Sequence, residues 1–141
     1  MVYKRKQPLA IFILSLIGIF LTSLLIKSRY LSEKTFCLTG GNSCDVVSNS
    51  IYSEIAGIPV CVFGLFWFLI TAYMAVKLVN KKNAVLSKYL MYWSVLGILF
   101  VGYFLFVEAF LINAFCSTCT AVHILIGIIF LLSYSIFRKT S

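Results

Sequence analysis

Four long apolar runs constrain the fold of this chain more than any other feature of its sequence. They cover Leu9–Ile26, Ile55–Val76, Tyr89–Val107 and about Cys116–Phe137. A helix needs roughly 20 apolar residues to cross the hydrocarbon core of a bilayer, so each run is long enough to span it. The first run lacks a cleavage site before Lys27, which favours a retained helix over a signal peptide. The sequence therefore predicts an all-α integral membrane protein with a four-transmembrane-helix bundle.

The composition favours a membrane protein over a soluble or nucleic-acid-binding one. Of the 141 residues, 62% are apolar and 11% are charged, which is more apolar material than a soluble domain of this length can bury. The net charge of +8 is compatible with a nucleic-acid partner, but the basic residues cluster between the apolar runs, as is typical of membrane proteins. We therefore expect one membrane domain over residues 1–141 and no nucleic-acid partner.

The positions of the basic residues predict the orientation in the membrane. One set lies at the N-terminus, in and beside the second connection and at the C-terminus: Lys4, Arg5, Lys6, Lys77, Lys81, Lys82, Lys88, Arg138 and Lys139. The two other connections contain only Lys27, Arg29 and Lys34. Cytoplasmic connections carry the excess of Lys and Arg, so both termini are expected on the cytoplasmic side of the cell (cytoplasmic or inner) membrane. Four of the five cysteines then face the oxidising, extracytoplasmic side, where disulfides persist.

A C-x-x-C pair, Cys116 and Cys119, stands where the fourth apolar run begins. On a helix these residues point about 60° apart, on one face, and the free amides and dipole of the first turn favour a reactive thiolate. Asn113 or Ser117 can cap this helix. A structural disulfide closing so small a loop stabilises little, so the pair predicts redox chemistry. The fifth cysteine, Cys61, lies among apolar residues and is interpreted as a small buried hydrophobic residue.

The other cysteine pair, Cys37 and Cys44, frames the segment CLTGGNSC in the first outer connection. Gly40 and Gly41 allow the chain to turn back, so a disulfide across the segment is feasible. It could serve redox exchange or only staple the loop. Zinc is a further alternative, bound by four cysteines or by three with His123, but C-x6-C is looser than the usual zinc spacing and the oxidising side disfavours it. We expect no metal.

A short surface helix is predicted after the loop pair. Val47, Ile51 and Ile55 recur at i, i+4 and i+8, with polar residues opposite, which is typical of a helix lying on the membrane surface. Such a helix in the first extracytoplasmic loop would hold Cys44 over the mouth of the bundle, near Cys116.

The single histidine, His123, follows Cys119 by four residues and is therefore expected on the same face, one turn deeper. A polar ring inside a membrane helix is costly unless it has a partner. Two interpretations stay open: a hydrogen bond to a neighbouring helix, or a hydrogen bond donated to a quinone carbonyl. Glu108, near the outer end of the third helix, also needs water or a partner, and His123 is one candidate.

Three segments resemble the prokaryotic homologues of vitamin K epoxide reductase: the loop pair CLTGGNSC, then DVVSNSIYSEIAGIPV leading into the second helix, and VEAFLINAFCSTC opening the fourth. The resemblance covers about residues 9–137. It implies a DsbB-like membrane thiol:quinone oxidoreductase, built as a four-helix bundle around a quinone such as ubiquinone or menaquinone. Many prokaryotic members of the family carry a fused thioredoxin-like domain. We expect no such domain in residues 1–141, so the resemblance implies a separate thioredoxin-like (DsbA-like) partner whose reoxidation supports disulfide-bond formation.

The resemblance also implies residue roles. Carried over by position, Cys37 exchanges with the partner, Cys44 passes electrons to Cys116, and Cys119 faces the quinone. Ser50 matches the family's serine on the surface helix and is expected, with Cys119, at the quinone. Thiol–disulfide exchange needs a thiolate that reaches a disulfide sulfur, so two cysteine pairs allow two sequential exchanges.

Two positions depart from the animal enzymes. Ala56 stands where they have an asparagine that contacts the quinone, and His123 stands where they have a tyrosine. Both differences argue against vitamin K epoxide itself as the substrate, and neither opposes a simpler quinone reaction. The alternatives are a quinone or epoxide reductase with another role, and a non-enzymatic tetraspan protein with structural disulfides. A scaffold keeps its cysteines oxidised beside a reducing partner, whereas an enzyme cycles them.

Overall fold

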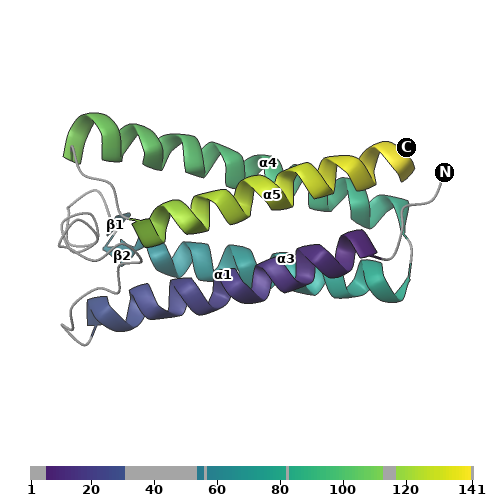
Figure 1. Ribbon diagram of the computed structural model, residues 1–141, viewed down its shortest axis with the longest axis horizontal. Helices are drawn as coiled ribbons and strands as arrows, with labels where there is room; N and C mark the ends of the chain where they lie inside the picture. Colours follow the sequence, from purple (N-terminus) through teal and green to yellow (C-terminus); the bar gives the residue numbers. More distant parts are fainter. Residues whose placement is uncertain (1–5, 31–53, 56, 82, 113–116, 141) are drawn as a thin grey trace.

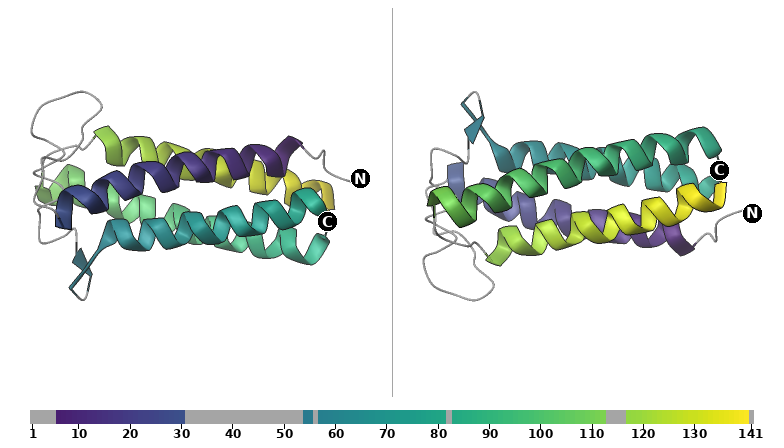
Figure 2. Two further views of the ribbon diagram at one scale, coloured as in Figure 1. Left: turned by 90° about the horizontal axis from the view of Figure 1, so that it is seen from below. Right: turned by 90° about the horizontal axis from the view of Figure 1, so that it is seen from above.

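The computed structural model describes residues 6–30, 54–55, 57–81, 83–112 and 117–140, most of which form four long helices (Figure 1). All four are long and apolar enough to cross a membrane, so the predicted four-helix membrane bundle is confirmed. The beginning of the first helix and the end of the last lie at the same end of the bundle as the turn between the second and third (Figure 2). The helices are α1 (Lys6–Tyr30), α3 (Val60–Asn80), α4 (Ala84–Phe106) and α5 (Ser117–Thr140).

The second spanning helix begins later than the sequence predicts, at Val60 rather than Ile55. Two short strands, β1 (Glu54–Ile55) and β2 (Ile58–Pro59), pair antiparallel just before it. Gly57 between them has φ +81°, a left-handed conformation that favours glycine and ends any helix there. Ile55, the last member of the stripe predicted for a surface helix, is therefore in a strand. The rest of that stripe and Ser50 lie outside the described residues.

The third helix begins earlier than predicted, at Ala84 rather than Tyr89, because Asn83 caps it. The Asn83 side-chain oxygen accepts hydrogen bonds from the backbone N–H of Val85 at 3.0 Å and of Leu86 at 3.4 Å, which satisfies amides of the first turn. At its other end, α4 continues as a π-helix, η2 (Val107–Ile112).

The bundle is built from two helix pairs. Helix α1 packs mainly on α3 and helix α4 on α5, while α1 also contacts α5. Outward positions carry large apolar side chains, such as Phe20, Leu99 and Phe110, which are 63–70% exposed and suit contact with lipid. Buried positions include many small hydroxyl residues, which let helices approach closely in a membrane: Ser15, Thr22, Thr71, Ser87, Ser94, Thr118 and Ser133.

The described basic side chains are concentrated at the end of the bundle that holds the termini. Lys77 places its Nζ 5.4 Å from the ring centre of Tyr73, and the Arg138 guanidinium lies 5.9 Å from that of Tyr134. Aromatic rings with neighbouring cations are typical of a membrane–water interface. This end of the bundle therefore carries the features of a charged membrane boundary.

Candidate functional site

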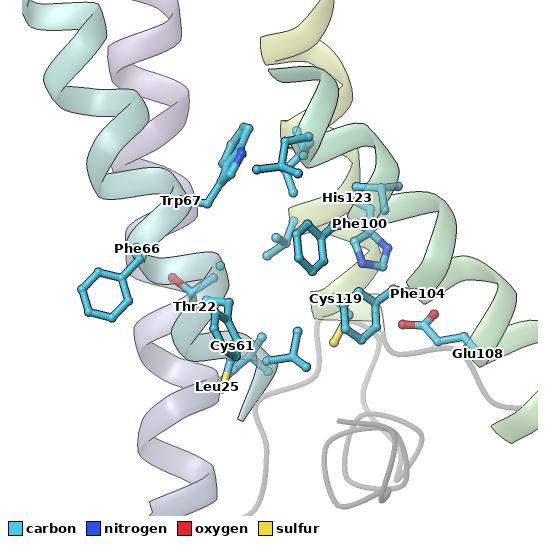
Figure 3. A pocket seen from close by; sticks show the side chains of 18 of the residues that line it. Thr22, Leu25, Cys61, Phe66, Trp67, Phe100, Phe104, Glu108, Cys119 and His123 are labelled. Carbon is cyan, nitrogen blue, oxygen red and sulfur yellow. The ribbon is translucent and has the colours of Figure 1, made fainter. Parts of the chain in front are cut away.

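A cavity of about 330 Å³ lies between the four helices, near the end of the bundle opposite the termini (Figure 3). Its volume is within the range of pockets that bind small molecules. The wall is mostly aliphatic and aromatic, with Leu25 of α1, Phe63 of α3 and Phe100 of α4 among the lining residues. The cavity therefore suits an apolar ligand that reaches it at membrane depth.

Cys119 and His123 both line this cavity. They lie one turn apart on α5, so the shared face expected from their spacing is observed. The His123 ring stacks against Phe104 of α4, with ring centres 6.3 Å apart and planes 23° apart. Figure 3 shows the Cys119 sulfur at the loop end of the cavity and the imidazole one turn deeper. A thiol and a hydrogen-bonding ring thus face the same small space.

Cys61 also lines the cavity, from the first turn of α3. It is partly exposed, and Figure 3 places it on the α1–α3 side, across from Cys119. The sequence indicated only a packing role for Cys61. An apolar neighbourhood in the sequence does not reveal which side of the helix faces a cavity, so this position could not be inferred from the pattern.

Two tryptophans, Trp67 and Trp93, form the deep wall of the cavity. The Trp67 Nε1–H donates to the Trp93 carbonyl at 3.2 Å, and the Trp93 Nε1–H donates to Thr71 Oγ1 at 3.0 Å. Their rings stack with centres 6.3 Å apart and planes 12° apart. Among the described residues of α3 and α4, none beyond this pair toward the termini lines the cavity. The pair therefore closes it on that side and joins α3 to α4.

The close approach of Trp67 to α4 depends on Gly97. A Cβ at this position would lie 2.6 Å from a Trp67 ring carbon, closer than packed atoms come. No motif in the sequence indicates this contact, because it joins residues from two helices through tertiary packing. The tryptophan wall is thus the main part of the site that sequence reasoning missed.

Glu108 is the acidic residue of the cavity. It belongs to η2 and is 1% exposed, and its Oε2 has no hydrogen-bond partner within the described ranges. His123 Nδ1 also has no hydrogen-bond partner among the described residues. Buried polar atoms are nearly always hydrogen-bonded in folded proteins, so these two atoms are polar groups of the cavity wall that are able to hydrogen-bond a ligand.

The other predicted site residues are Cys37, Cys44, Ser50 and Cys116, all of which lie outside the described residues. The structure therefore brings together Cys119 and His123 of the predicted set and adds Cys61, Glu108 and the tryptophan pair around the same cavity.

Residues 9–134 match the sequence model of the vitamin K epoxide reductase family. The matched range begins in α1 and ends in α5, so it includes every described residue that lines the cavity. Members of this family are membrane oxidoreductases that use quinones as electron acceptors, in agreement with an apolar cavity between four membrane-spanning helices. The chain belongs to the vitamin K epoxide reductase family.

Proposed function

We propose that this protein oxidises a separate thioredoxin-like protein and passes the electrons through two cysteine pairs to a quinone, which supports disulfide-bond formation. The single observation that carries the proposal is that Cys119 and His123 line one apolar cavity at membrane depth. Overall, a dithiol and a quinone give a disulfide and a quinol, so two electrons and two protons move together.

The cavity fits a quinone ring by chemistry as well as by size. Its walls are apolar and aromatic, and two buried polar atoms, Glu108 Oε2 and His123 Nδ1, lack partners in the described part of the chain. A flat ring bearing carbonyl oxygens offers a hydrogen-bond acceptor to an imidazole N–H of His123. When bound, a quinone supplies a two-electron acceptor that is soluble in the membrane.

The residue roles follow from position. Cys119 presents its sulfur to the cavity, and His123 donates a ring N–H to a carbonyl oxygen, a bond that strengthens as negative charge develops there. From the sequence resemblance, Ser50 serves as a second hydrogen-bonding group at the quinone. Cys116 exchanges with the outer pair, whose Cys44 reduces it and whose Cys37 reacts with the protein donor; these roles rest on the sequence resemblance.

The orientation belongs to the same proposal. All described basic side chains except Lys27 lie toward the end that holds the termini, opposite the cavity, so we place both termini in the cytoplasm and the cysteines on the extracytoplasmic side. After reduction of intact cells, a membrane-impermeant maleimide should label Cys37. Labelling that requires cell lysis would reverse the orientation.

The decisive experiment combines the purified protein, a reduced thioredoxin-like protein and a soluble short-chain quinone, and follows the quinone absorbance. The parent should reduce the quinone with this donor and also with dithiothreitol. Cys37→Ala and Cys44→Ala should lose turnover with the protein donor and keep it with dithiothreitol, because a small reductant can reach the inner pair directly. Equal loss from all cysteine variants with both donors would contradict the relay and favour a single structural unit.

A further inference from the structure

Glu108 is a buried carboxyl group to which the relay described above gives no role. Its side chain is 1% exposed, and an acidic side chain at membrane depth is costly unless it is paired or functional. Its Oε2 accepts no hydrogen bond from any described residue. Packing alone therefore does not account for a carboxyl group at this position.

The π-helix η2 sets the direction of this side chain. Val107 and Glu108 are each 1% exposed, whereas Phe106 and Phe110 on either side are 54% and 70% exposed. The wider turn of a π-helix changes the face that each residue presents, and such turns occur frequently at functional sites. Here the local geometry directs the carboxyl group inward and the aromatic rings outward.

The inward direction brings Glu108 to the same cavity as Cys119 and His123. Figure 3 shows its carboxylate at the loop end of the cavity, where the Cys119 sulfur also lies. The other titratable side chains of the described lining are Cys61 on α3 and, on α5, Cys119 and His123; α1 contributes none. Glu108 is therefore the only carboxyl group among the described residues that face this space.

We infer that Glu108 carries protons between the Cys119 thiol and the oxygens of a quinone in the cavity. The inference rests on the proposed function. Forming the disulfide releases two thiol protons as two electrons leave the sulfur atoms, and forming the quinol takes up two protons on its oxygens. Glu108 accepts a proton and then gives it up, so it ends each turnover in its starting state and no further reactant is needed.

The test compares Glu108→Gln and Glu108→Asp with the parent, using dithiothreitol as donor and a short-chain benzoquinone as acceptor. Glutamine keeps the shape and cannot exchange the proton, so kcat should fall about 100-fold or more, with KM for the quinone within about threefold. Aspartate keeps the carboxyl group and should recover part of kcat. Ser133→Ala, which removes a buried hydroxyl elsewhere on α5, should leave kcat unchanged.

Infrared spectra give a readout that does not depend on turnover. Oxidation of the reduced parent with diamide should change the carboxyl C=O stretching band, and this change should be absent from Glu108→Gln. The inference would be overturned if the carboxyl band of the parent did not change with the redox state. It would also be overturned if Glu108→Gln had the parental kcat, or if the variant lost kcat and quinone affinity to the same extent. If the Gln variant fails to fold, the infrared change in the parent and the recovery by Asp decide. A parent that reduces no quinone removes the proposed function and the inference together.

Discussion

The Trp67–Trp93 pair divides the bundle into a packed half toward the termini and a cavity half at the other end, and the two halves differ in how their buried polar groups are hydrogen-bonded. In the half beyond the tryptophan pair, toward the termini, Thr71 Oγ1 of α3 accepts a hydrogen bond from the Trp93 Nε1–H of α4 at 3.0 Å, and Ser94 Oγ of α4 lies 2.9 Å from Ser133 Oγ of α5. In the cavity half, Glu108 and His123 each keep a buried atom without a partner in the described structure. One half uses polar groups to join helices, while in the other Glu108 and His123 line the cavity. Gln7, at the far end near the termini, has the one other such atom among the described residues.

The largest effect is expected from Cys119→Ala, which removes the cavity thiol that lies one helical turn from His123. Quinone reduction should fall to the background rate with any donor, because the inner pair can no longer form a disulfide. The fold should persist, since alanine replaces a small side chain. Cys61→Ala is the matched control, because it removes a thiol from the same cavity and should retain turnover. Loss of turnover in both variants would mean that turnover is sensitive to any substitution in the cavity wall, and would not support a specific role for the Cys119 sulfur.

Trp67→Ala should open the wall that separates the cavity from the packed half of the bundle. The substitution removes the deep wall and leaves an internal void, so the free energy of unfolding in detergent should fall by about 3–5 kcal/mol. Phe66→Ala, one residue earlier and 59% exposed, is the control and should cost less than about 1 kcal/mol. Equal losses would show that the wall does not separate a packed half from an open one.

A smaller effect is expected from His123→Ala, which removes a polar ring and leaves the thiols in place. The loss of a hydrogen bond to a reacting oxygen costs on the order of 1–3 kcal/mol, or roughly 5- to 150-fold in rate. His123→Tyr should recover part of this, since a phenol can donate from the same face. Initial rates against quinone concentration, with the thiol oxidation state checked in parallel, measure the effect. Parental rates for His123→Ala at every concentration would leave the histidine a packing role only.

The smallest effect is expected in the packed half. Ser133→Ala removes the contact between α5 and α4 at Ser94, and hydrogen bonds between membrane helices contribute about 0.6 kcal/mol on average. The free energy of unfolding should fall by about that amount, and quinone reduction should stay at the parental rate. A clear drop in turnover would show that the packed half is coupled to the cavity.

Much of the architecture was predictable because lipid imposes a simple rule on helix length and composition. The four apolar runs predicted four spanning helices, and helical periodicity placed Cys119 and His123 on one face. The predicted start of the second helix at Ile55 is wrong because the apolar run continues through Gly57, whose left-handed backbone conformation lies in the turn between β1 and β2.

The rest of the site was beyond sequence reasoning for a physical reason. The Trp67–Trp93 pair, the gap at Gly97 and the cavity position of Cys61 depend on how helices distant in sequence pack together. Glu108 stood out in the sequence only as an acid near a helix end. Its inward direction depends on a π-helix, which no short pattern in this chain indicates.

The tryptophan wall has an optical consequence. The chain contains two tryptophans, and both of them line the cavity. Quinones are efficient quenchers of indole emission at short range, so filling of the cavity should dim nearly all of the protein's native fluorescence. Intrinsic tryptophan fluorescence therefore reports how much of the cavity is occupied. Titration of the protein with different quinones, in detergent or vesicles, can rank their affinities without an attached dye.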